Sequence, residues 1–308
     1  MKARPLASWI TGCALGLILG AVLAKALYLL AALGNPFALY GWHALIRTLP
    51  TEFSFFGGAL GFVLGFRAGV KLTGDPVRES LDALACPFCL LIALLRFGTL
   101  FLDAVGLGEF RRLGLPYVED GSPLAFFPLG IQDRWGDWWL AVGSLEALIA
   151  LGCAVYALFR RKAYAHTPGL LFLRCCVILC TGQVVLEFLH NAGTVSYFVH
   201  TEQAFAALFL LVTTIIAARR IGKRNAGIAP WKYPALLLVF AAVNGLVQFW
   251  MDKPYWVLSL LPEASGNWLS EHLNLVGFIL LFLSALAMGA VTLRSVSRAY
   301  PSGGDQQA

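Results

Sequence analysis

The chain has 308 residues, of which 59% are hydrophobic and only 13% are charged. Its mean hydropathy of +0.74 is typical of membrane proteins and excludes an ordinary soluble domain. The formal charge of +6 at pH 7 does not indicate nucleic-acid binding, because the basic residues form short clusters beside apolar segments. We therefore expect a membrane protein that does not bind nucleic acid.

Apolar segments of about twenty residues, the length that crosses a bilayer, recur eight times along the chain. They are residues 9–33, 53–72, 82–102, 138–158, 169–189, 203–218, 231–251 and 273–293. The first is too long for the hydrophobic region of an ordinary signal peptide, so we expect it to be retained as a span. The predicted fold class is an all-α polytopic membrane protein with about eight transmembrane helices.

Basic residues predict the orientation of these spans, because Lys and Arg are enriched in cytoplasmic loops. The clusters lie near residues 2–4, 71–78, 160–162, 219–224 and 294–298. Placing all of them on one side puts both termini in the cytoplasm. The external segment 36–50 is too short to span and is expected to lie along the interface as an amphipathic helix.

A basic linker containing Gly and Pro near residues 225–230 predicts a division of the chain. Residues 1–224 are expected to form a bundle of six spans. Residues 225–308 would comprise the linker, two further spans and a cytoplasmic tail.

Glycines recur every fourth residue in the second span, at Gly57, Gly61, Gly65 and Gly69. This spacing puts all four on one helix face. It predicts that another helix backbone approaches closely there.

Polar residues within the spans are the candidates for function. Counting about 1.5 Å per residue, Arg96, Glu146 and Glu187 are predicted to share one layer in the outer half of the membrane. A guanidinium there suits a phosphate or carboxylate, as in a phospholipid head group. The alternative is a structural ion pair between Arg96 and one of the two glutamates.

Other polar groups leave two interpretations open. Gln183 and His190 lie near the helix face of Glu187, and Gln183 fits either a polar lining or interhelical hydrogen bonding. Lys25, in the outer half of the first span, either assists an anionic head group or extends its amine to the interface. Asn244 and Gln248, four residues apart, are predicted to serve helix packing.

All seven cysteines fall within predicted spans, which argues against an external disulfide framework. The segment from Cys86 to Cys89 has the spacing of a redox motif. In an apolar helix, however, an uncharged Cys behaves as a small hydrophobic residue, and no neighbouring histidine completes a ligand set. We expect neither a metal nor another cofactor.

Four segments resemble motifs of one enzyme family, the prolipoprotein diacylglyceryl transferases. Residues 54–61 are similar to its S-F-H-G-G-L-I-G stretch. Residues 95–104 are similar to G-R-L-G-N-F-I-N-G-E, with Arg96 in the place of the family's essential arginine. Residues 144–148 resemble Q-L-Y-E-L-L, and residues 183–190 resemble R-I-I-V-E-F-F-R. The resemblance covers roughly residues 10–220.

Several positions depart from the family pattern. Phe56 replaces a histidine, Thr99 an asparagine and Ala104 a glutamate beside Asp103, and Gln183 and His190 replace two arginines. The last two spans have no counterpart in the family.

The resemblance implies a phospholipid-dependent transferase in the bacterial cytoplasmic membrane, with a lipid-accessible cleft in the outer half. In the family's reaction, a cysteine thiol of a prelipoprotein displaces glycerol phosphate from phosphatidylglycerol. The expected partners are therefore that phospholipid and a prelipoprotein signal peptide. The alternative is a catalytically degenerate lipid-binding or membrane-assembly protein on the same scaffold.

The same resemblance predicts a set of site residues. The expected catalytic residues are Arg96, Glu146 and Glu187, and the expected substrate-binding residues are Gly57, Gly58, Gln183, His190 and Asp103. Arg96 would hold the departing phosphate, with a glutamate as an orienting or basic partner. Because Phe56 replaces the family's histidine, the general base remains open among His190, His43 and Asp103.

Overall fold

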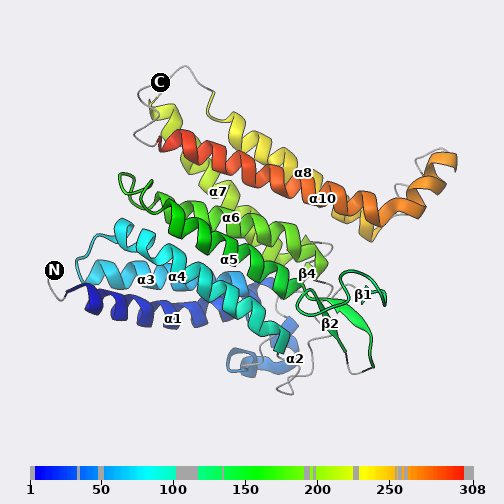
Figure 1. The fold of residues 1–308 in the computed structure, drawn as a ribbon, viewed down its shortest axis with the longest axis horizontal. Coiled ribbons are helices and arrows are strands. Elements are labelled where there is room, and N and C mark those ends of the chain that lie inside the picture. Colours follow the sequence, from blue (N-terminus) through cyan, green and yellow to red (C-terminus); the bar gives the residue numbers. More distant parts are fainter. Residues whose placement is uncertain are drawn as a thin grey trace. The chain divides into compact units, whose positions relative to one another are not determined.

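The computed structural model describes residues 4–32, 35–47, 52–101, 117–133, 135–190, 195–196, 199–224, 229–253, 255, 259 and 263–301. Eight of the described helices are long and apolar enough to cross a membrane, and each overlaps one predicted span. They are α1 (Arg4–Ala31), α3 (Phe55–Leu72), α4 (Val77–Gly98), α5 (Val142–Arg160), α6 (Leu170–Leu186), α7 (Thr201–Arg224), α8 (Lys232–Asp252) and α10 (Glu263–Ala299) (Figure 1). The prediction of eight membrane-length helices is confirmed.

Shorter elements connect these helices. The short helices are α2 (Asn35–Tyr40) and the 3-10 helices η1 (Gly41–Leu45), η3 (Thr99–Phe101) and η6 (Glu187–Leu189). The strands are β1 (Tyr117–Val118), β2 (Gly130–Gln132), β3 (Trp138–Leu140), β4 (Val195–Ser196) and β5 (Val199–His200).

A small antiparallel sheet in the order β1-β3-β2 corrects the predicted start of the fourth span. Trp138 and Trp139 were expected at the beginning of that span. They lie instead in β3, where Trp139 pairs with Tyr117 and Trp138 with Gln132. Aromatic residues favour such a pleated, half-buried surface, and α5 begins only at Val142.

The predicted interfacial helix is divided into two short helices. Gly41, the first residue of η1, has φ +55, a left-handed conformation that glycine adopts without steric cost. Leu39, Trp42 and Ile46 are exposed, as expected of a segment that lies against lipid.

The chain forms two compact units. The first comprises residues 1–176 and 189–196, and the second comprises residues 177–188 and 197–308. In the second unit α7 groups with α8 and α10, and the division expected near residue 225 stays a prediction. The transferase-like role expected of residues 1–224, and its absence from the last two spans, also stay predictions.

In the first unit, α1 and α3 pack backbone to backbone along the glycine face. A Cβ atom added at Gly57 would lie 2.6 Å from the carbonyl oxygen of Leu23, and one at Gly69 would lie 2.6 Å from the Cα atom of Gly12. Gly61 and Gly65 are even closer to the α1 backbone. The predicted close approach is confirmed, because even an alanine side chain would overlap α1.

Asp82 connects α4 with the first turn of α6, also within the first unit. Its carboxylate accepts hydrogen bonds from the backbone N–H groups of Gly169, at 2.7 Å, and Phe172, at 2.9 Å. A carboxylate at this position satisfies helix donors that have no partner within the helix, and it complements the helix dipole.

The second unit is held together by buried amide side chains. The Nε2 atom of Gln203 donates to Oδ1 of Asn244 at 3.1 Å, and Nδ2 of Asn244 donates to Oγ of Ser284 at 2.9 Å. Gln248 joins the network through Oε1 of Gln203 at 2.6 Å. These bonds connect α7, α8 and α10, so the packing role predicted for Asn244 and Gln248 is confirmed.

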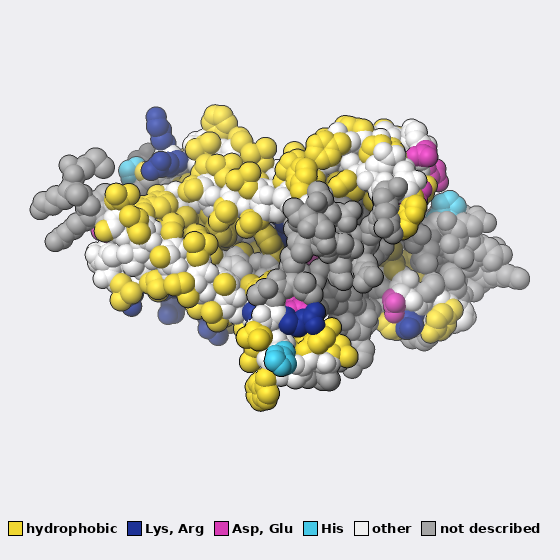
Figure 2. All heavy atoms as spheres, turned by 90° about the horizontal axis from the view of Figure 1, so that it is seen from below, with side chains coloured by type: hydrophobic (Ala, Val, Ile, Leu, Met, Phe, Trp, Pro, Cys, Tyr) yellow, Lys and Arg dark blue, Asp and Glu magenta, His cyan; other side chains and the backbone are white. Residues whose placement is uncertain are grey.

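Figure 2 shows hydrophobic side chains over much of the described surface, with the charged side chains gathered in a few places. Large apolar residues on the long helices, such as Leu17, Leu94 and Leu246, are more than 60% exposed. A lipid environment accounts for this exposure, which water would penalise.

We predict that Gly61→Ala destabilises the protein, since its methyl group would collide with the carbonyl oxygen of Leu19. Overpacking of this kind costs about 1–3 kcal/mol. The matched control is Gly152→Ala in α5, where nothing lies within 4 Å of an added Cβ. Thermal unfolding in detergent should show a lower midpoint for Gly61→Ala alone. Equal midpoints for the two variants would contradict the close α1–α3 packing.

Candidate functional site

Arg96 lies in the last turn of α4 and is almost buried, with its side chain 11% exposed. Its guanidinium carbon Cζ lies 3.6 Å from the centre of the Phe55 ring. Its Nη1 atom lies 3.3 Å from Oε2 of Glu146 in α5. An aromatic face and a carboxylate therefore hold the charged group in an apolar bundle.

Glu146 also contacts an imidazole. Its other carboxylate oxygen, Oε1, lies 3.5 Å from Nε2 of His190, and the glutamate is only 7% exposed. Arg96, Glu146 and His190, all in the first unit, thus form a guanidinium–carboxylate–imidazole cluster. We call these three residues the Arg96 cluster.

Close packing of α4 and α5 brings the Arg96 cluster together. A Cβ atom at Gly143 would lie 2.7 Å from both the carbonyl oxygen of Arg96 and Oγ1 of Thr99. The Thr99 hydroxyl donates to that same carbonyl oxygen at 2.6 Å. Gly143 therefore allows the start of α5 to lie directly against the end of α4, which places Glu146 within reach of Arg96.

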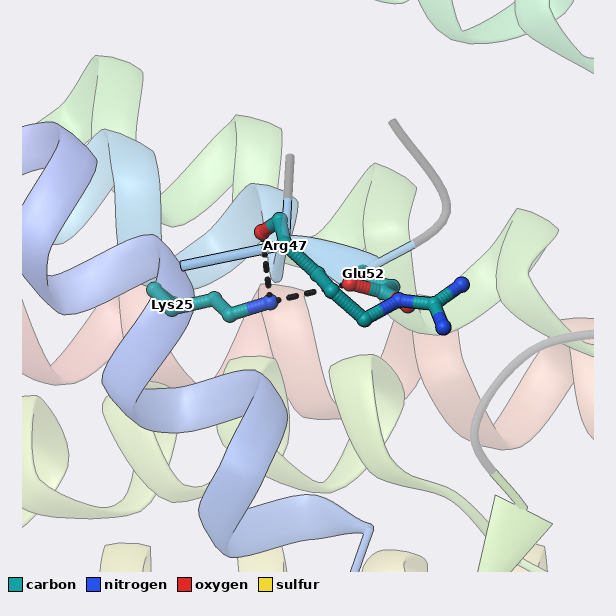
Figure 3. A network of polar contacts seen from close by, with 3 residues as sticks. All are labelled: Lys25, Arg47 and Glu52. Atoms are coloured by element: carbon teal, nitrogen blue, oxygen red, sulfur yellow. Dashed lines mark hydrogen bonds and ion pairs between the residues drawn. The ribbon is translucent and has the colours of Figure 1, made fainter. Parts of the chain in front are cut away.

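A second group of charges, which we call the Lys25 cluster, consists of Lys25, Arg47 and Glu52 (Figure 3). The Nζ atom of Lys25 lies 3.1 Å from Oε2 of Glu52, and Nε of Arg47 lies 2.8 Å from Oε1. Lys25 also donates to the backbone carbonyl of Arg47 at 2.9 Å. The Arg47 guanidinium stacks 3.7 Å above the centre of the Tyr40 ring.

Both clusters lie where α3 begins. The Lys25 ammonium is 5.2 Å from the centre of the Phe53 ring, and Phe55, two residues later, covers Arg96. Ser54 lies between these two aromatic residues in the sequence, and its N–H group donates to the carbonyl oxygen of Ala24 at 2.9 Å. The clusters together hold three cationic side chains and two carboxylates, so the two clusters carry a net positive charge even with His190 neutral.

Gln183 and Glu187 belong to the second unit, where the Gln183 amide donates a hydrogen bond to the Glu187 carboxylate. Glu187 is 5% exposed. Their pairing agrees with the predicted common helix face. The expectation that Glu187 shares a layer with Arg96 and Glu146 stays a prediction.

The remaining expected site residues differ in their surroundings. Gly57 and Gly58 pack against α1, and their expected role in substrate binding stays a prediction. His43 is exposed in η1, and Phe56 lies in the first turn of α3. Asp103 lies outside the described residues.

Sequence reasoning missed the Lys25 cluster and the ring that covers Arg96. The available signal for the Lys25 cluster was the pair of charged residues Arg47 and Glu52, which flank the short segment before α3. Charges beside a span often pair. Phe55 gave no signal of its own, because aromatic residues are common at the start of a span.

Comparison of the chain with models of protein families, with curated proteins and with solved structures found no match.

We predict that Glu52→Gln destabilises the protein by about 3–5 kcal/mol, the usual cost of removing one partner from a buried ion pair. The variant leaves Lys25 and Arg47 without their carboxylate. As a matched control, Asp252→Asn breaks the exposed pair of Asp252 with Lys253, whose charged atoms are 3.6 Å apart, at a cost of about 0–1 kcal/mol. The free energy of unfolding is measured by titration with SDS. Equal losses would show that Glu52 does not neutralise buried charge.

Proposed function

We propose that the chain is a phospholipid-dependent transferase of the bacterial cytoplasmic membrane, which attaches a diacylglyceryl group to a lipoprotein cysteine. In this proposal both termini are cytoplasmic. The Arg96 cluster and the Lys25 cluster lie in the outer half of the membrane and line a cleft that is open to lipid. Phosphatidylglycerol is the proposed donor, and a prelipoprotein with its signal peptide is the proposed acceptor.

The observation that carries the proposal is the Arg96 cluster itself. A nearly buried guanidinium among membrane-length helices is costly unless it pairs with an opposite charge or binds a ligand. Arg96 pairs with the Glu146 carboxylate, and a guanidinium presents five N–H donors in a planar fork. Such a group suits a phosphate oxygen, and the net positive charge of the two clusters favours an anionic lipid over a zwitterionic one.

Each member of the Arg96 cluster has a role in the proposed reaction. His190 takes the proton of the acceptor thiol, because only the thiolate is a good nucleophile. The sulfur–carbon bond to the diacylglyceryl group then forms as the carbon–oxygen bond to the phosphate breaks. Arg96 stabilises the charge that develops on the departing glycerol phosphate. Glu146 orients both of these side chains, since one of its oxygens faces Arg96 and the other faces His190.

His190 is the proposed base because of where its imidazole lies. Its Nε2 atom is 3.5 Å from Glu146, and a carboxylate beside one ring nitrogen favours the tautomer in which the other nitrogen carries the lone pair. The imidazole is thereby suited to accept a proton. His43 is exposed in η1 and does not share these contacts.

One observation favours the alternative, a catalytically degenerate protein that binds lipid without turnover. Phe56 stands where the resemblance places a histidine, so a hydrocarbon ring occupies the position of a polar group. Under this alternative, the protein retains phosphatidylglycerol through Arg96 but modifies no thiol.

The test is expression in cells depleted of their own diacylglyceryl transferase, with lipid attachment to a reporter lipoprotein as the readout. We predict modification by the unsubstituted protein and a loss of at least about a hundredfold for Arg96→Ala, comparable to the loss of one transition-state donor. His190→Asn should lose about 100- to 10,000-fold, the contribution of a general base.

The matched control is Arg67→Ala, which removes an exposed arginine from α3 and should leave modification unchanged. Absence of modification by the unsubstituted protein, with phosphatidylglycerol still co-purifying, would support the alternative instead. Equal modification by the unsubstituted protein and Arg96→Ala would remove Arg96 from the mechanism.

A further inference from the structure

Three cysteine side chains from three different helices meet inside the first unit. Cys89 lies in α4, Cys153 in α5 and Cys175 in the part of α6 that belongs to this unit. All three are at most 2% exposed, and their sulfur atoms lie within 4.8 Å of one another. None of them forms a disulfide. We call them the cysteine triad.

The spacing of the three sulfurs is close to that of a trigonal metal site. Three thiolate sulfurs at about 2.3 Å from a common ion lie about 4 Å from one another. Since the sulfurs of the cysteine triad are already within 4.8 Å, small rotations of the side chains suffice to enclose an ion. The thiol of Cys153 now points to the carbonyl oxygen of Cys175 at 3.6 Å, so it already faces α6.

The number and type of ligands select the class of ion. Zn²⁺ strongly prefers four ligands in structural sites, and no fourth His, Cys, Asp or Glu joins the cysteine triad among the residues that the structure describes. Soft thiolates favour Cu(I).

We propose that the cysteine triad is a binding site for a soft monovalent metal ion of the Cu(I) class. Binding forms three metal–thiolate bonds and releases the three thiol protons to solvent. The ion joins α4, α5 and α6. This site uses none of the side chains proposed for lipid transfer, so metal binding is independent of the proposed transferase function.

The experiment uses the purified full-length protein in lipid nanodiscs, reduced and kept free of oxygen, with Cu(I) supplied from a chromophoric chelator. We expect the protein to withdraw one Cu(I) per chain. X-ray absorption at the copper edge should then show three sulfur neighbours at about 2.3 Å. A shell containing nitrogen or oxygen, or fewer than three sulfurs, would overturn the proposal without the use of any variant.

Single variants Cys89→Ala, Cys153→Ala and Cys175→Ala should each lose the bound ion. Cys13→Ala in α1 and Cys86→Ala, one turn before Cys89, serve as matched controls and should retain it. Elution as a single species in size-exclusion chromatography verifies that each variant is folded. Retention of Cu(I) by the three triad variants, or tighter binding of Zn²⁺ than of Cu(I), would contradict the assignment.

Discussion

The ion pair of Arg96 with Glu146 is the interaction on which one end of the first unit depends, because either charge alone among apolar helices would be costly. The pair requires α4 and α5 to pack closely, which the absent side chain of Gly143 allows. The Phe55 ring also contacts the guanidinium. That ring is held by the start of α3, where the hydroxyl of Ser54 accepts a hydrogen bond from the Gly57 N–H group. Gly57 in turn packs against α1, so backbone packing and charge pairing support each other.

The helices of the two units are held together by different interactions. In lipid, helices gain little from the hydrophobic effect when they associate, so close packing and interhelical hydrogen bonds must hold them together. The first unit uses small residues, which let α1 and α3 meet along their backbones. The second unit uses buried amides, with Asn244 bonded to side chains of both α7 and α10. Bonds of this second kind contribute only about 0.6 kcal/mol each on average, so several are needed.

Hydropathy was sufficient to predict the eight long helices, because the thickness of the bilayer sets their length. The four-residue spacing of the glycines likewise predicted a helix contact, although it did not identify α1 as the partner. Tertiary packing determines how each helix is rotated about its axis toward its neighbours, and the sequence of a single helix does not show this rotation. For that reason the convergence of Cys89, Cys153 and Cys175 from three helices was not foreseen, and the role of Phe55 beside Phe56 was missed. The pair of Arg96 with Glu146 was predicted only as one of two alternatives, because depth alone does not distinguish Glu146 from Glu187.

The central claim is that Arg96 recognises the phosphate of an anionic phospholipid. The most direct measurement is a high-resolution structure of the protein in nanodiscs that contain phosphatidylglycerol. The account predicts a lipid phosphate within hydrogen-bonding distance of the Arg96 guanidinium, with the Glu146 carboxylate still in contact with Arg96 and His190. Lipid phosphates found only at the membrane surface, with Arg96 enclosed by Glu146 and Phe55 and out of reach of any head group, would contradict it and leave the ion pair a purely structural role.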